Sequence, residues 1–180
     1  IAIVVVSIIG YCNGFMIAKL KMAPFIATFG MSTIVYGINC LYFSMEPNRS
    51  QPIGGIREEL TSLSSTKLFG EISLLVPIAL VVTLAVWFVL NKTVFGKNIY
   101  IVGGNKEAAK VSGVDVNKVI MYAFIIESIL VGFAGILEVA RTGGANSAYG
   151  FSYEFDAISA CVVGGVSLSG GIGKVEGVVI

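Results

Sequence analysis

The sequence contains no histidine and only three cysteines, and both scarcities exclude classes of function. Without an imidazole there is no Ser/His/Asp or Cys/His catalytic set and no histidine-based metal site. Cys12, Cys40 and Cys161 lie far apart inside apolar segments and form no Cys-x-x-Cys pair. They indicate buried free thiols and neither a zinc site nor a disulfide framework. Because the carboxylates are also scattered along the chain, we expect no catalysis, no metal ion and no other cofactor.

Charge is scarce as well. Charged residues make up 13% of the chain and hydrophobic residues 56%, whereas about 25% of the residues in soluble domains are charged. This composition excludes an ordinary soluble domain. Two apolar runs, Ile72 to Leu90 and Val119 to Ala140, are each long enough to cross a hydrocarbon core of about 30 Å. The basic residues gather beside these runs and do not alternate with exposed aromatics, so we exclude nucleic acid as a partner.

Glycine-rich nucleotide motifs are missing. Gly173-Lys174 has Leu168 where a Walker loop needs its first glycine and Val175 where it needs a hydroxyl group. The spacing from Gly171 to Gly177 is one residue too long for a dinucleotide-binding loop. We therefore do not expect this chain to bind a nucleotide.

The order of the apolar segments predicts an all-α, polytopic membrane fold. Besides the two runs above, Ile1 to Ala18 is expected to be a first span or the second part of one, and Phe25 to Met45 is expected to be a further span. Pro24 precedes the second of these, and proline suits the first turn of a helix. Residues 46–71, which are rich in serine and glutamate, are expected on the outer face. A second outer segment is expected to begin with residues 141–147. Since the chain begins and ends inside apolar runs, we expect a fragment of a longer membrane protein.

Residues 91–118 form a polar segment between two spans and are expected to be a cytoplasmic loop. Five of the twelve Lys and Arg residues lie there, and the positive-inside rule places short basic loops in the cytoplasm. Within it, Asn105 suits a helix N-cap, Glu107 suits the positive end of a helix, and Gly113 suits the C′ position. We therefore expect a helix of two turns in this loop.

The small side chains of this expected helix favour close approach by another protein. The alternative is an amphipathic turn at the lipid headgroups, with Lys106 and Lys110 touching anionic lipid from one face. The surface expected to be smooth consists of Ala108, Ala109 and Val111, beside Ser112. The residues expected to dock a partner are Asn105, Glu107, Ala108, Ala109, Ser112 and Gly113.

Glycine becomes frequent after residue 163. Each interior glycine costs a helix about 1 kcal/mol relative to alanine, so we expect a short helix, a break and a further helix, as in a re-entrant or broken segment. Irregular backbone is tolerated in a bilayer where it is buried or lines a watery cavity. Glycine also lets helices pack closely, and both roles remain open here. The residues expected either to line a pathway or to allow close packing are Gly164, Gly165, Gly170 and Gly171.

Two polar residues inside predicted spans have open roles. An ionisable group at a helix centre costs about 2.5–3.5 kcal/mol on insertion scales, so Glu127 is expected to face a partner or a watery path. The alternative is a protonated carboxyl group that is hydrogen-bonded to a neighbouring helix or lies close enough to the boundary to reach water. Asn39 is ambiguous in the same way. Ser128 and Gly132 have small-xxx-small spacing, which predicts a helix contact.

Three ordered motifs resemble the permease subunit of sugar ABC importers of the ribose and galactose type. They are KLKMAPFIATFGM at 19–31, GNKEAAKVSGV at 104–114, and YEFDAI at 153–158 followed by GGVSLSGGIG at 164–173. Within that family, NKTVFGKNI at 91–99 and ACVVGGV at 160–166 resemble the galactose/methyl-galactoside permeases. Glu127, Lys174 and Glu176 depart from the small and hydroxyl residues expected in this family.

The resemblance implies that residues 1–180 are a fragment of one transmembrane permease domain in the bacterial inner membrane. Such a subunit translocates the sugar and leaves ATP hydrolysis to a separate partner. The implied partners are an ABC ATP-binding subunit, a sugar-binding protein on the outer side and a second permease copy. The segment from Gly104 to Gly113 is implied to seat in a groove of the ATPase.

Other functions remain open at this stage. The permease could carry ribose, another sugar or a nucleoside in place of galactose or a methyl galactoside. An ion-coupled secondary transporter would also use broken helices and an intramembrane carboxylate such as Glu127. A membrane scaffold would explain the apolar composition but would leave the capped basic helix and the glycine break without a purpose.

Overall fold

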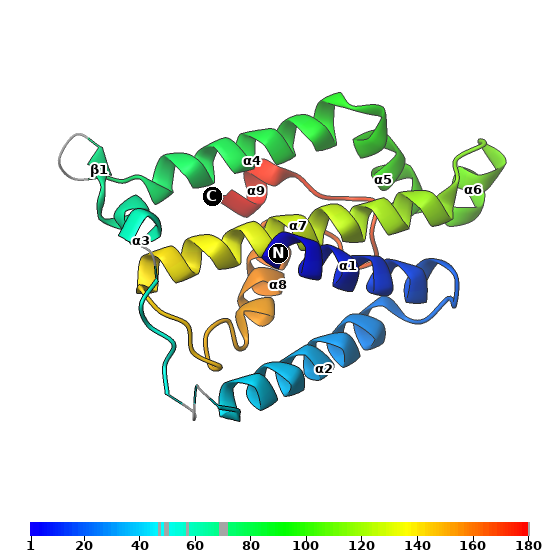
Figure 1. The fold of residues 1–180 in the computed structure, drawn as a ribbon. Helices are drawn as coiled ribbons and strands as arrows, with labels where there is room; N and C mark the ends of the chain where they lie inside the picture. The colour runs from blue at the N-terminus through cyan, green and yellow to red at the C-terminus, as the bar shows by residue number, and fades with distance from the viewer. Residues whose placement is uncertain (47, 49–50, 57, 69–71, 180) are drawn as a thin grey trace.

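The computed structural model describes residues 1–46, 48, 51–56, 58–68 and 72–179, and these ranges are mainly helical (Figure 1). The described strands are short: β1 (Lys67–Leu68) pairs antiparallel with β2 (Ile72–Ser73). The prediction of an all-α fold is confirmed. The helices are α1 (Ala2–Ala18), α2 (Pro24–Ser44), α3 (Glu58–Ser65), α4 (Leu75–Lys92), α5 (Val94–Gly104), α6 (Lys106–Val111), α7 (Val116–Thr142), α8 (Tyr153–Val163) and α9 (Val175–Val179).

Helices α2, α4 and α7 are long and apolar enough to cross a membrane, and α1 is a shorter apolar helix of 17 residues. The 27 residues of α7 extend for about 40 Å at 1.5 Å per residue. Pro24 begins α2 as predicted. Large apolar side chains along these helices are exposed, which is the surface expected of helices that face lipid or further membrane segments.

A seam of small residues joins α1 to α7, which lie side by side (Figure 1). A Cβ atom added to Gly10 would lie 2.7 Å from the carbonyl oxygen of Phe124, and one added to Gly132 would lie 2.5 Å from a methyl group of Val6. The helices are therefore antiparallel and too close for larger side chains at these points. The helix contact predicted from Ser128 and Gly132 is confirmed, since the Ser128 side chain lies directly against Gly10.

Several predicted boundaries change. The span expected from Ile72 begins at Leu75, because Ile72 belongs to β2. The expected loop 91–118 is largely helical, since it contains the end of α4, all of α5 and α6, and the start of α7. The outer segment holds α3 and β1. Its residues 47, 49–50, 57 and 69–71 lie outside the described residues, so the expectation for 46–71 is examined only in part.

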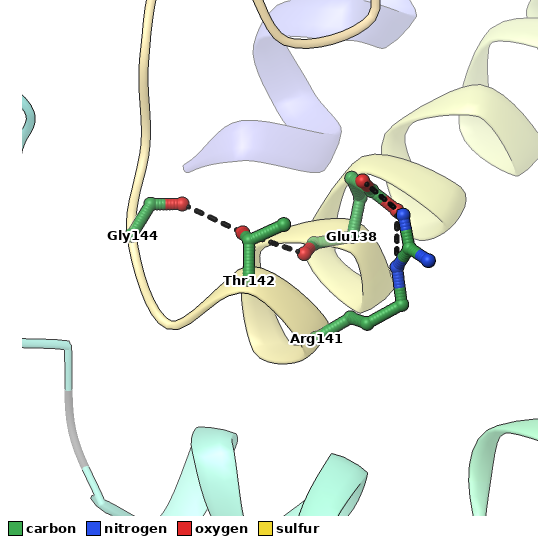
Figure 2. A network of polar contacts seen from close by, with 4 residues as sticks. All are labelled: Glu138, Arg141, Thr142 and Gly144. Carbon is green, nitrogen blue, oxygen red and sulfur yellow. Dashed lines mark hydrogen bonds and ion pairs between the residues drawn. The ribbon is translucent and has the colours of Figure 1, made fainter.

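The C-terminal end of α7, which leads into the predicted second outer segment, is closed by a polar network (Figure 2). Arg141 donates to both carboxylate oxygens of Glu138, at 3.1 and 2.9 Å. The hydroxyl of Thr142 lies 2.9 Å from the carbonyl oxygens of Glu138 and Gly144. From α3, the Ser64 hydroxyl donates to the carbonyl of Ala140 at 2.9 Å. These contacts satisfy terminal carbonyls and tie this end of α7 to α3.

Candidate functional site

The first turn of α6 is built by its N-cap. The side-chain oxygen of Asn105 accepts hydrogen bonds from the backbone N–H groups of Glu107 and Ala108, both at 3.0 Å. These are two of the four N–H groups that lack a partner at a helix start. The carboxylate of Glu107 lies in the same turn, where the helix dipole favours negative charge. The predicted cap is confirmed.

The last turn of α6 ends in a left-handed glycine. Gly113 has φ = 81°, and the N–H of Val114 donates back to the carbonyl of Ala109 at 3.0 Å. The Ser112 hydroxyl donates to the carbonyl of Ala108 at 2.9 Å. Because a β-carbon disfavours this φ value, Gly113 occupies the C′ position that the sequence predicts.

One face of α6 packs inward. Ala109 is completely buried, and with Val102 of α5 and Val119 of α7 it forms a hydrophobic cluster. The expectation that Ala109 lies on the docking surface is therefore wrong. The cause is tertiary: α5 and α7 close over this side of α6, which a six-residue pattern does not reveal. Ala109 instead fixes α6 to both neighbouring helices.

The opposite face of α6 is open. Glu107, Ala108 and Ser112 are exposed as predicted. Val111 protrudes most, with 89% of its surface exposed. We define these four residues as the docking face. The sequence analysis placed Val111 on the smooth surface but did not identify it as the apolar tip, because that requires knowing that Ala109, half a turn away, is buried.

The turn from α6 into α7 carries an ordered charge pair. The carboxylate of Asp115 caps α7 by accepting the backbone N–H of Lys118 at 3.1 Å, and it also lies 3.2 Å from the Lys118 ammonium group. These hydrogen bonds, the backbone one first, lower the pKa of Asp115 below its ordinary value. The carboxylate is thus held ionised at the start of α7.

The glycine break lies between α8 and α9, as predicted. Gly165, Gly170 and Gly171 have φ values of 81°, 90° and 75°, which side chains with a Cβ rarely adopt. Gly164 has an ordinary φ, but a Cβ there would lie 2.5 Å from the carbonyl oxygen of Gly177. All four predicted glycines therefore supply either a special backbone conformation or close approach.

The glycine segment borders an open hollow of about 440 Å³. The hydroxyl of Tyr100, from α5, donates to the carbonyl of Gly173 at 3.1 Å on its wall. Main-chain groups and the side chains of Tyr100 and Lys174 provide its polar chemistry. The lining residues are Tyr100, Gly164, Gly165, Gly171, Ile172, Gly173, Lys174 and Gly177.

Glu127 and Asn39 do not join either of these sites. Glu127 lies close to the middle of α7 and is exposed, and within the described residues no hydrogen bond or ion pair to it is present. Asn39 is exposed on α2, which Figure 1 shows lying apart from α4, α5 and α6. The hydrogen-bonded form of Glu127 that the sequence left open is therefore not found among the described residues.

Membrane-length helices together with helices interrupted by irregular backbone occur in membrane transporters. Residues 1–180 match the family described as branched-chain amino acid transport system / permease component, and the chain belongs to this family. The predicted membership in a permease family is confirmed. No solved structure matches the chain.

Several relatives of the chain are named as sugar import permeases. The chain is 45% identical over 180 residues to the galactose/methyl galactoside import permease of Escherichia coli (strain K12), covering 96% of the chain and 52% of that protein. The corresponding permease of Haemophilus influenzae (strain Rd) is 43% identical over 176 residues, with the same coverage. The ribose import permease of Escherichia coli (strain K12) is 35% identical, covering 96% of the chain and 53% of that protein. The chain therefore spans about half the length of these relatives.

Proposed function

We propose that this chain is part of the translocation subunit of an ATP-driven monosaccharide importer in the bacterial inner membrane. The observation that carries the proposal is the capped, outward-facing helix α6, held between two apolar helices in a chain that belongs to a permease family. Galactose or a methyl galactoside is the proposed substrate, because identity to those permeases is 43–45%, against 35% to a ribose permease.

A separate ATP-binding subunit is the proposed partner of the docking face. Val111 offers an apolar tip, Ala108 allows close approach, and Glu107 and Ser112 offer polar contacts around it. Asn105 and Gly113 shape both ends of the helix. The basic residues of 91–118 support a cytoplasmic position for this face under the positive-inside rule, and ATP is available there. ATP hydrolysis then belongs to the partner, and this chain is not itself an enzyme.

The remaining proposed partners lie elsewhere on the chain. A sugar-binding protein would deliver the sugar at the outer side, near the end of α7 that Arg141 and Glu138 close (Figure 2). A second permease copy and the remaining segments of the full-length subunit would cover the exposed apolar helix faces. Glu127 and Asn39 are proposed to face such membrane segments or the sugar path, since an exposed carboxylate in lipid is costly.

The buried face of α6 explains how docking produces movement. Since Ala109 packs against Val102 and Val119, a displacement of α6 carries α5 and α7 with it. Closely packed cores transmit displacement and have little room to absorb it. Binding and hydrolysis of ATP in the partner would therefore change the tilt of α7 and, through it, the sugar path.

The proposal is tested with the full-length permease, its ATPase and its binding protein in sealed vesicles. Galactose uptake should require ATP, and the ATPase should co-purify with the permease. Ala108→Glu should weaken ATPase association and uptake together, because it places a charge at the close-approach point. Ala148→Glu, at an exposed alanine that follows residues 141–147 in the predicted second outer segment, is the matched control for ATPase association. ATP-dependent uptake that is normal in Ala108→Glu would contradict the docking face.

Ion-coupled transport is the second candidate, and the exposed carboxylate in the middle of α7 is the observation that favours it. A proton or cation site at Glu127 would support uptake driven by an ion gradient without any ATPase. Glu127→Gln would then abolish that uptake. In the ATP-driven importer, uptake by Glu127→Gln should still depend on ATP, so the two candidates give different results in the same vesicles.

A further inference from the structure

Four glycines form a backbone contact between the end of α5 and the glycine break. A Cβ added to Gly103 would lie 2.6 Å from the backbone nitrogen of Gly171, and one added to Gly170 would lie 2.7 Å from the carbonyl oxygen of Gly103. A Cβ added to Gly171 would lie 2.5 Å from the Cα of Gly104. We name Gly103, Gly104, Gly170 and Gly171 the glycine clasp. A side chain at Gly103, Gly170 or Gly171 would push the end of α5 away from the glycine break.

The clasp lies directly before the docking helix. Gly104 is the last residue of α5 and precedes Asn105, which caps α6. No flexible linker separates the two helices, because the same Asn105 closes α5 with a backbone hydrogen bond to Ile101 at 3.0 Å. Since only Asn105 lies between α6 and Gly104, a displacement of α6 also displaces Gly104 and the neighbouring Gly103.

Two further contacts hold the glycine segment on the α4–α5 side. Tyr100, one turn before the clasp, donates its hydroxyl proton to the carbonyl of Gly173 at 3.1 Å. The indole N–H of Trp87 in α4 donates to the carboxylate of Glu176 in α9 at 2.5 Å. The segment that leaves α8 thus runs back to α5 and then along α4, as Figure 1 shows. It is attached at three points to the helices that lead into α6.

We propose that the glycine clasp transmits movement of the docking helix directly to the broken segment after α8. This inference rests on the proposed function, because it assumes that an ATPase moves α6. It adds a route that does not pass through the tilt of α7: α6 displaces the end of α5, and the backbone of residues 170–171 follows. Gly103 is the positioning residue in this route, whereas Gly104 contributes only its backbone, which an alanine at this position retains.

The test compares two alanine substitutions at adjacent positions of α5. The Cβ in Gly103→Ala overlaps the backbone of Gly171 at 2.6 Å, whereas the Cβ in Gly104→Ala has only the Cα of Gly171 near it, at 4.0 Å. Both changes raise helix propensity equally. The assay uses the full-length permease with its ATPase and binding protein in vesicles, and it measures labelled galactose taken up per ATP hydrolysed.

Gly103→Ala should lower uptake per ATP by about tenfold, because overfilling a packed contact displaces its members, while co-purification of the ATPase stays at the parent level. Gly104→Ala should keep the parental ratio. Because ATP hydrolysis belongs to the partner, the ratio is measured on co-purified complexes, so that loss of folded permease does not enter it. Equal ratios of galactose uptake to ATP hydrolysis in both variants and the parent would overturn the proposed role of the clasp.

A second variant tests the proposal even if Gly103→Ala does not fold. Tyr100→Phe removes the hydrogen bond to Gly173 without adding any atom, and it should also lower uptake per ATP, though less than Gly103→Ala. A parental ratio in a well-expressed Tyr100→Phe variant would count against the proposal. If the ATPase does not associate with the parent permease at all, the proposed function fails, and this outcome is distinct from failure of the clasp.

Discussion

Removing the N-cap of α6 offers a sharp test of the docking helix. Asn105→Ala deletes the two 3.0 Å hydrogen bonds to the amides of Glu107 and Ala108. Loss of an asparagine cap costs about 1 kcal/mol, which corresponds to about a fivefold rise in the frayed population of the first turn at 25 °C. Helix α6 has only six residues, so intrinsic helix propensity does not compensate.

The assay is hydrogen exchange of the full-length permease in lipid nanodiscs. The amides of Glu107 and Ala108 should exchange about fivefold faster in Asn105→Ala, while the amide of Val119 in α7 should be unchanged. Asn105→Ser is the control, because serine is an equally good cap. ATPase association should weaken in the alanine variant only. Unchanged exchange at both amides would refute the view that Asn105 holds the docking helix in shape.

Two further predictions concern the scaffold. Gly10→Val should destabilise the protein by about 1–3 kcal/mol, measured by thermal unfolding in detergent, because its Cβ would lie 2.7 Å from the carbonyl oxygen of Phe124. Gly37→Val is the control and should be well tolerated, because no atom lies near a Cβ at that position. Equal losses of stability in the two variants would contradict the close packing of α1 against α7. Because hydrogen bonds lower the pKa of folded Asp115 below its ordinary value, protection of the Lys118 amide should be complete above that ordinary pKa and lost as pH falls through the lowered pKa. After correction for intrinsic exchange, Asp115→Asn should remove this acid transition, and its persistence would contradict the assignment.

Local features of α6 could be predicted because they depend on neighbouring residues. An asparagine followed by an acidic residue, and a glycine eight positions later, specify both helix ends through hydrogen bonds within one turn. The glycine break could be predicted for the same reason. Apolar length identified the spans to within a few residues, although Ile72 was assigned to a helix that begins at Leu75.

Tertiary features could not be predicted in the same way. The burial of Ala109 depends on where α5 and α7 lie, and alanine suits either a buried or an exposed face. Helix α5 was assigned to a loop because its lysine, asparagine and glycines suggested a polar turn, yet Thr93 caps it and accepts the N–H of Gly96 at 3.2 Å. The clasp joins Gly103 to residues 170–171, and no local pattern indicates a contact across that separation.

Chemical cross-linking from Val111 tests the central claim most directly. In a full-length permease with Cys12, Cys40 and Cys161 replaced, Val111→Cys should form a cross-link to the ATP-binding subunit through a short thiol-to-amine reagent, because this side chain is 89% exposed at the tip of the docking face. Tyr149→Cys, in the predicted second outer segment that begins at Arg141, is exposed by 50% and should give none. A cross-link that depends on Val111→Cys supports docking through α6. Absence of that cross-link in a complex that hydrolyses ATP and imports galactose would contradict it.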